Sequence, residues 1–254
     1  MNILRSFYVA LSMYSRIPVP RVAWTEDSMK YAMCFFPVIG VVQGVLFAGL
    51  WILLVHSGFG VCFRSALLTA LPVLVTGGIH MDGFLDTVDA LSSWQTKERR
   101  LEILKDSHTG AFAIIGGGLY FLLYAGGVSE IQSMRAAVMT GCGFVLSRIL
   151  SAGALVLLKG AKKEGLAYTF MSGAHRNRTR MALAAELAAV LLVMAELWLT
   201  GAVVMAVLAA GTWLYYRGMA YRQFGGITGD LAGFFLQICE LLLLYGIVIA
   251  DRFF

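Results

Sequence analysis

The stretch that decides the fold is TGGIHMDGFLDTVDALSSWQTKERRLEILKDSHTGAF, residues 76–112. It holds six of the fifteen acidic residues of the chain: Asp82, Asp86, Asp89, Glu98, Glu102 and Asp106. The sequence on both sides of it is overwhelmingly apolar. Carboxylates next to such segments are costly unless they face water or bind a cation. The pattern predicts a polar active-site stretch attached to a membrane-embedded bundle.

The composition supports a membrane protein. Of the 254 residues, 59% are hydrophobic and only 14% are charged, whereas a soluble domain has about 45–50% apolar and about 25% charged residues. We therefore expect an all-α, polytopic integral membrane bundle, forming a single domain over residues 1–254. The net charge of +5 fits basic loops facing anionic lipids. Nucleic-acid binding is not expected, because no basic face is interleaved with aromatic residues.

The apolar segments predict about seven transmembrane helices, since about 20 apolar residues span a bilayer. An amphipathic helix over residues 2–15 is expected to precede them on the membrane surface, within an N-terminal segment of residues 1–30. RIPVPR, residues 16–21, ends that helix, because each proline restrains itself and the residue before it. The predicted spans are residues 31–55, 61–78, 111–128, 136–158, 181–199, 203–216 and 231–249.

The basic residues predict the orientation. Most of the 20 Lys and Arg residues fall into the N-terminal segment and the loops on the same side of the bundle, and only Arg64, Arg135 and Arg252 fall into the opposite loops. By the positive-inside rule, the N-terminus and the acidic stretch face the cytoplasm, and the chain lies in the cytoplasmic (inner) membrane. Membrane lipids are then partners, and whether the chain forms a homo-oligomer stays open.

Three aspartates in the stretch have helical spacing. Asp82, Asp86 and Asp89 are four and then three residues apart, which places them on one face of a helix. Three carboxylates on one face repel one another unless a cation joins them, and oxygen ligands suit Mg²⁺ completed by substrate phosphates. Glu102 and Asp106 repeat the four-residue spacing. The alternative is a solvated acidic loop with ordinary ion pairs.

Several other residues in and near the stretch are candidates for substrate binding or proton transfer. Gly83 leaves room for a close approach of substrate, and His80 or His108 is a candidate general base. The candidates for holding phosphate oxygens are Arg16, Arg99, Arg100 and Lys105.

FGGITGD, residues 224–230, opens the seventh predicted span. Backbone N–H groups at a helix start bind phosphate, so Gly225, Gly226 and Thr228 are candidates for a phosphate cradle. Asp230 either adds to the metal ligands or caps the helix.

Two charges fall inside predicted spans, Arg148 in the fourth and Glu240 in the seventh. Such residues usually face the bundle interior. They pair with each other as a structural bridge, or Arg148 faces a substrate phosphate, and the sequence does not choose between these roles.

GGIHMDGFLDTVDAL followed by RRLEILKDSHTGAF resembles the signature of the cobalamin synthase family, the adenosylcobinamide-GDP ribazoletransferases. The family pattern reads roughly G-G-x-H-x-D-G-x-x-D-x-x-D-G-L, then a stretch ending E-I-M-K-D-S-x-x-G. RIPVP, FFPVIG and GGITGD match further landmarks in order. Ala90 stands where the family usually has glycine, Leu104 where it has methionine, and Ser92 and Ser93 where glycine-rich sequence often follows.

The resemblance implies a late step of cobalamin biosynthesis, in which adenosylcobinamide-GDP and α-ribazole, or its 5′-phosphate, are joined and GMP is released. Mg²⁺ is the implied cofactor. Asp82, Asp86, Asp89 and Asp106 would be metal or phosphate ligands, with His80, Glu102, Lys105 and Asp230 near them. The expected chemistry is an in-line phosphoryl transfer, in which Lys105 and Arg99 stabilise the equatorial oxygens and a carboxylate or His80 accepts the proton.

Two other functions compete with this one. A CDP-alcohol phosphotransferase-like enzyme also places aspartates on membrane helices, but its usual D-G-x-x-A-R signature is broken here at Asp86 and Thr87. A transporter would use Arg148 and Glu240 along a pathway, but the carboxylates cluster outside the predicted spans and no inverted repeat is visible.

Overall fold

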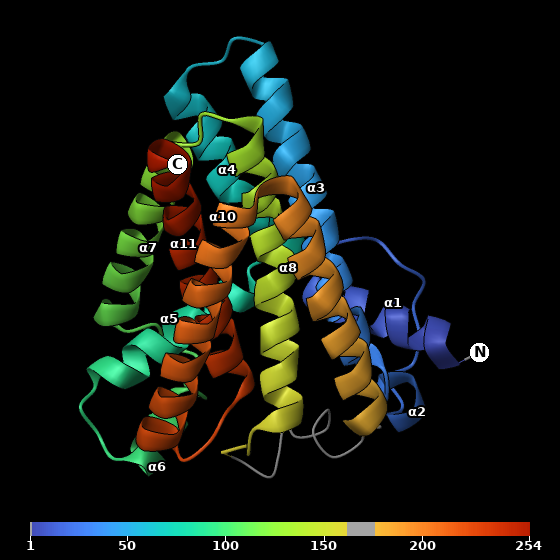
Figure 1. Cartoon of the computed structure of the whole chain (residues 1–254). Helices are drawn as coiled ribbons and strands as arrows, with labels where there is room; N and C mark the ends of the chain where they lie inside the picture. Colours follow the sequence, from blue (N-terminus) through green and yellow to red (C-terminus); the bar gives the residue numbers. More distant parts are fainter. Residues whose placement is uncertain (1, 162–175) are drawn as a thin grey trace.

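The computed structural model describes residues 2–161 and 176–254, and in this part of the chain helices are joined by loops, without a β-strand (Figure 1). Residues 162–175, from a predicted cytoplasmic loop, lie outside the described residues. The helices are α1 (Asn2–Tyr14), α2 (Glu26–Met29), α3 (Ala32–His56), α4 (Val61–Thr76), α5 (Ile79–Ser92), α6 (Lys97–Ile103), α7 (Ala111–Ser129), α8 (Met134–Leu157), α10 (Arg176–Phe224) and α11 (Gly229–Phe253).

Five of these helices, α3, α7, α8, α10 and α11, are long and apolar enough to cross a membrane, and a bent pair, α4 and α5, makes six if it counts as one span. α10 is broken at Trp198, whose φ of −171° and ψ of 101° are not helical. Figure 1 shows the chain running in opposite directions on either side of this break. The two halves correspond to the fifth and sixth predicted spans. The polytopic bundle is confirmed, whereas the count of seven stays a prediction.

The second predicted span ends earlier than expected. α4 stops at Thr76, and Gly77 and Gly78, with φ of +69° and +82°, turn the chain by 96° into α5. Positive φ is strained for residues with a Cβ, so this turn needs glycine. The first half of the acidic stretch is therefore helix α5 lying crosswise to the bundle, in agreement with the helical spacing of its aspartates. With three aspartates in 14 residues, we place α5 outside the spanning segments.

α3 and α8 form the tightest helix pair at the centre of the bundle. An ideal Cβ on Gly40 would lie 2.5 Å from the carbonyl oxygen of Phe144, and one on Gly44 would lie 2.6 Å from that of Gly141. Small residues at four-residue spacing thus let the two backbones approach closely.

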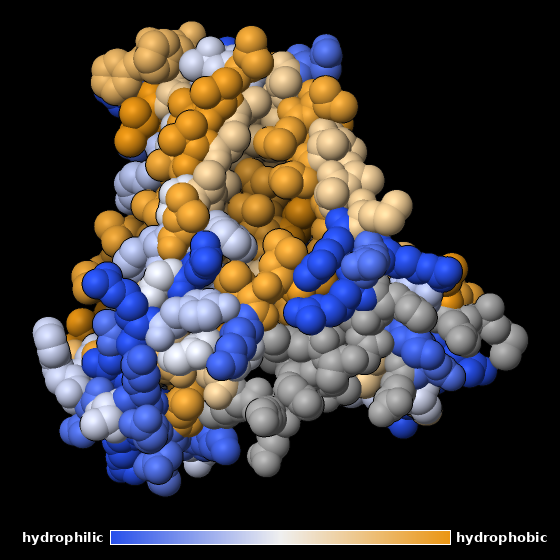
Figure 2. All heavy atoms as spheres, turned by 60° about the horizontal axis from the view of Figure 1, so that its bottom comes forward, coloured by the Kyte–Doolittle hydropathy of each residue, from blue (hydrophilic) through white to orange (hydrophobic). Residues whose placement is uncertain are grey.

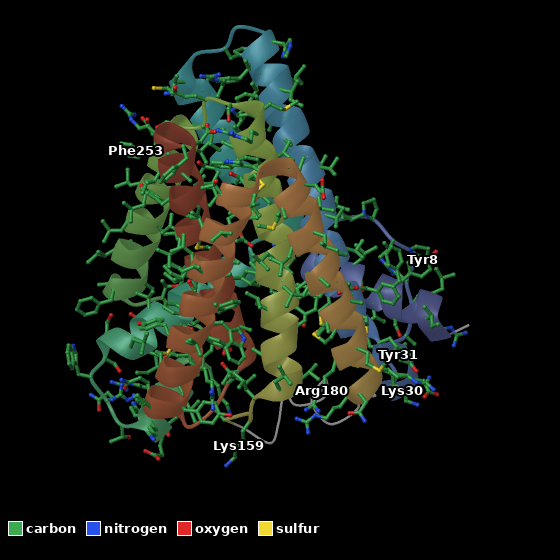
Figure 3. All side chains as sticks on the ribbon, in the orientation of Figure 1. Tyr8, Lys30, Tyr31, Lys159, Arg180 and Phe253 are labelled. Carbon is green, nitrogen blue, oxygen red and sulfur yellow. The ribbon has the colours of Figure 1, made fainter. Side chains whose placement is uncertain are left out.

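The two ends of the bundle differ in polarity. Lys30, Lys159 and Arg180 gather at the end where α5 and α6 lie, and Phe253 marks the opposite end (Figure 3). Figure 2 shows hydrophilic residues around the first end and hydrophobic residues beyond it. The acidic stretch therefore belongs to the basic end of the molecule, which is the end predicted to face the cytoplasm.

Candidate active site

The three aspartates of α5 lie on a helix, as their spacing predicted. Asp82 is exposed, and Asp86 and Asp89 are half-buried. Burial raises the pKa of Asp86 to about 6, and the negative charges of Asp82, Asp230 and Asp89 add to this rise. The four carboxylates therefore interact electrostatically, although Asp230 is far from the others in sequence.

Two glycines bring α11 onto α5. An ideal Cβ on Gly83 would lie 2.8 Å from the Cα atom and the carbonyl oxygen of Asp230, and one on Gly233 would lie 2.8 Å from the carbonyl oxygen of His80. Thr228 is the N-cap of α11, and its side chain accepts the N–H of Leu231 at 3.2 Å. Gly83 thus receives the protein backbone at Asp230, where the sequence predicted room for substrate.

The donors do not converge on a single point. Within residues 2–161 and 176–254, no group of three or more His, Cys, Asp or Glu side chains is arranged to hold a metal ion. The carboxylates of α5 and Asp230 are nevertheless oxygen donors that repel one another, which is the donor chemistry Mg²⁺ prefers. These carboxylates fit the ion in the chemistry of their donor atoms.

His80 is buried rather than open to substrate. Its ring stacks on Tyr14 with centroids 5.9 Å apart and meets the edge of Phe36 at 5.6 Å. Burial, helped by the positive charge of Arg148, lowers the pKa of His80 to about 3. The imidazole is therefore neutral at working pH and a weak proton acceptor, so the arrangement favours a carboxylate as general base.

The second half of the stretch, residues 93–109, forms an arm that contains α6, and two ion pairs lie within the arm. Oε2 of Glu102 accepts a hydrogen bond from Nη1 of Arg99 at 2.6 Å, and Oδ1 of Asp106 lies 2.7 Å from Nδ1 of His108. All four side chains are exposed, as is that of Lys105. The arm is the solvated alternative with ordinary ion pairs, and the structure shows no contact between Glu102 or Asp106 and the α5 carboxylates.

Two glycines of FGGITGD have structural roles. Gly225 has a φ of +78°, which favours glycine. An ideal Cβ on Gly226 would lie 2.6 Å from the backbone of residues 159–161, and Ile227 forms a parallel bridge with Gly160. Protein backbone thus occupies the space beside Gly226, and the predicted role of this residue in a phosphate cradle finds no support.

Arg148 and Glu240 form the structural bridge that the sequence left open. Arg148 is 1% exposed, and its Nη1 donates to Oε1 of Glu240 at 2.8 Å. Its Nη2 donates to Oε1 of Gln43 at 2.6 Å. The pair joins α3, α8 and α11 inside the bundle, so the predicted contact of Arg148 with substrate finds no support.

Arg16 lies at the turn that starts α5. Its backbone N–H donates to the carbonyl oxygen of Val75 at 2.8 Å, and its exposed side chain lies against Gly77. The RIPVP segment thus places a cation beside the turn that starts α5, and the phosphate-binding role of Arg16 stays a prediction.

Sequence reasoning missed two glycines that shape the site. Gly233 lets α11 touch α5, and Gly110 receives the carboxylate of Asp89, whose Oδ2 accepts its N–H at 3.1 Å. The sequence indicated these two glycines only weakly, because Gly233 lies three residues after Asp230 and Gly110 ends the DSHTG part of the motif.

Comparison with known proteins identifies the family of this sequence. The sequence model of the cobalamin-5-phosphate synthase family matches residues 6–248. An adenosylcobinamide-GDP ribazoletransferase of Lachnoclostridium phytofermentans is 46% identical over 99% of this chain and 96% of that protein. Proteins of the same name from Clostridium botulinum and Pseudomonas savastanoi are 31% and 30% identical, over 96% and 94% of this chain and 97% and 96% of their own. No solved structure matches. The chain belongs to the cobalamin-5-phosphate synthase family.

Proposed function

We propose that this chain transfers the phospho-cobinamide moiety of adenosylcobinamide-GDP to α-ribazole or its 5′-phosphate, giving adenosylcobalamin or its 5′-phosphate and GMP. The observation that carries this proposal is the near full-length similarity to relatives of that name. The family match favours this transfer over the CDP-alcohol phosphotransferase and transporter alternatives. The reaction belongs late in cobalamin biosynthesis, and the site faces the cytoplasm, where nucleotides are found.

We propose Mg²⁺ as the cofactor, held by Asp82, Asp86 and Asp230. The support is the crowding of negative charge on Asp86, which a divalent cation would relieve. When bound, such an ion neutralises charge on the diphosphate and on the leaving phosphate.

The residues of this chain then have distinct roles. Asp82 or Asp86 of α5 accepts the proton of the attacking ribose hydroxyl, since buried His80 is too weak a base. Arg16, at the turn before α5, binds a phosphate of the nucleotide through its exposed guanidinium. Lys105 and Arg99 lie on the exposed arm and would reach the transferred group from there.

The test is GMP release by detergent-purified protein given adenosylcobinamide-GDP and α-ribazole. Asp82→Ala and Asp86→Ala should abolish GMP release while expression stays intact. Asp27→Ala is the matched control, because Asp27 is an exposed aspartate of α2 paired with Lys30. Near-normal turnover of either α5 variant would remove that residue from the site, and release of CMP from a CDP-linked substrate instead of GMP would overturn the assignment.

A further inference from the structure

α7 begins without a capping side chain of its own. Its N-cap is Gly110, which has no side chain, and the third helical residue is Ala113. The first N–H groups of a helix need acceptors from elsewhere. In a capping box, a Glu or Gln at that third position accepts the N–H of the N-cap residue. Here Oδ2 of Asp89 accepts the N–H of Gly110 at 3.1 Å, so α5 supplies the missing acceptor.

The fit between the two residues is close. An ideal Cβ on Gly110 would lie 2.2 Å from both carboxylate oxygens of Asp89. The carboxylate therefore packs flat against the Cα atom of Gly110, in space that any side chain would occupy. Alanine at this position would push the carboxylate away and break the hydrogen bond.

The contact between Asp89 and Gly110 joins the two ends of the arm. Between Asp89 and Gly110, the chain leaves α5, forms α6 and returns to α7. Farther out, Arg100 donates to Gln223 at the end of α10, which holds the arm against the bundle. The arm presents Arg99 and Lys105 to solvent at the basic end of the molecule. Loss of the Asp89–Gly110 contact would let Arg99 and Lys105 move relative to α5.

We infer that Asp89 is a positioning residue that ties the start of α7 to the end of α5, and not a ligand of the metal ion. This departs from the role that the spacing of the three aspartates suggested. The consequence for catalysis rests on the proposed function, whereas the tie itself does not.

The experiment is a double-mutant cycle in the full chain with Asp89→Ala, Gly110→Ala and both together, plus Asp89→Asn. Each variant is measured for its thermal unfolding midpoint in detergent, GMP release, and the Mg²⁺ concentration that gives half-maximal rate. Asp89→Ala and Gly110→Ala should each lower turnover about tenfold or more through displacement of the arm. Gly110→Ala should cause no further loss in the Asp89→Ala background, because the clashing carboxylate is then absent.

The variant Asp89→Asn distinguishes a residue that positions Gly110 from a residue that binds the metal ion. The amide oxygen of asparagine still accepts the N–H of Gly110, and asparagine caps about as well as aspartate. Turnover should therefore stay within about threefold of the parent, with an unchanged Mg²⁺ requirement. An inactive Asp89→Asn with a raised Mg²⁺ requirement, or additive losses in the cycle, would overturn the inference.

The outcomes separate this inference from the proposed function. If the parent protein releases no GMP, the proposed function fails, and the cycle measured by unfolding midpoints still decides whether the tie exists. If the parent turns over and the two alanine variants show independent losses, the tie fails alone.

Discussion

A single methyl group at Gly83 tests whether the crossing of α5 and α11 assembles the carboxylates. An ideal Cβ there would lie 2.8 Å from the backbone of Asp230, whereas ordinary contact begins at 3.4 Å. Because the obstacle is backbone, the two helices must separate by about 0.6 Å in Gly83→Ala. Overpacking of this kind costs about 1–3 kcal/mol, and a misplacement of about 1 Å at reacting groups costs on the order of 10²-fold in rate.

The assay is GMP release by the detergent-purified variant at saturating Mg²⁺, with the thermal unfolding midpoint measured in parallel. We expect turnover to fall about 10- to 100-fold and the midpoint to fall by several degrees. Gly49→Ala is the matched control, since it adds the same methyl group to a helical glycine of α3 with no atom within 4 Å. It should leave turnover unchanged and should not lower the midpoint, because alanine favours the helix more than glycine does.

The result that would refute the reasoning is Gly83→Ala with parental turnover and an unchanged midpoint. The helices would then have room for the methyl group, and Asp230 would not be held against α5. A loss of turnover with an unchanged midpoint would still support the role of the crossing in placing Asp230.

Three further predictions concern charge. Arg148→Met leaves Glu240 buried without its partner and should lower the free energy of unfolding by about 3–5 kcal/mol, and the double variant with Glu240→Leu should recover most of it. Equal losses in the single and double variants would contradict a paired bridge. In metal-free protein, the folded state holds the Asp86 proton more tightly than the unfolded state, so stability should fall as pH rises from about 4 to about 6. The fall should be on the order of 1–3 kcal/mol, Asp86→Asn should abolish it, and a parental profile without it would argue against crowded carboxylates. Arg16→Ala should raise KM for adenosylcobinamide-GDP about tenfold with a smaller change in kcat, and an unchanged KM would remove Arg16 from phosphate binding.

Local patterns predicted much of the fold. The predicted first span, residues 31–55, differs by one residue at each end from α3, Ala32–His56, because hydropathy and helix length are properties of one segment. The helical spacing of Asp82, Asp86 and Asp89 and the end of α1 before Arg16 were also visible in sequence. The turn at Gly77 and Gly78 was not predicted, since a pair of glycines does not specify whether a span continues or bends.

The sequence by itself determined a membrane-embedded helical bundle, an aspartate face on one helix, and membership of a family recognised by its motif. Only the tertiary structure decided which of the charged residues meet. Asp230 reaches the carboxylates because Gly83 and Gly233 permit a backbone contact between distant helices, and Asp89 meets Gly110 across the whole arm. Burial keeps His80 neutral, and the packing of the helices pairs Arg148 with Glu240. Desolvation and partner choice depend on atoms far apart in the chain, so residue spacing cannot specify them.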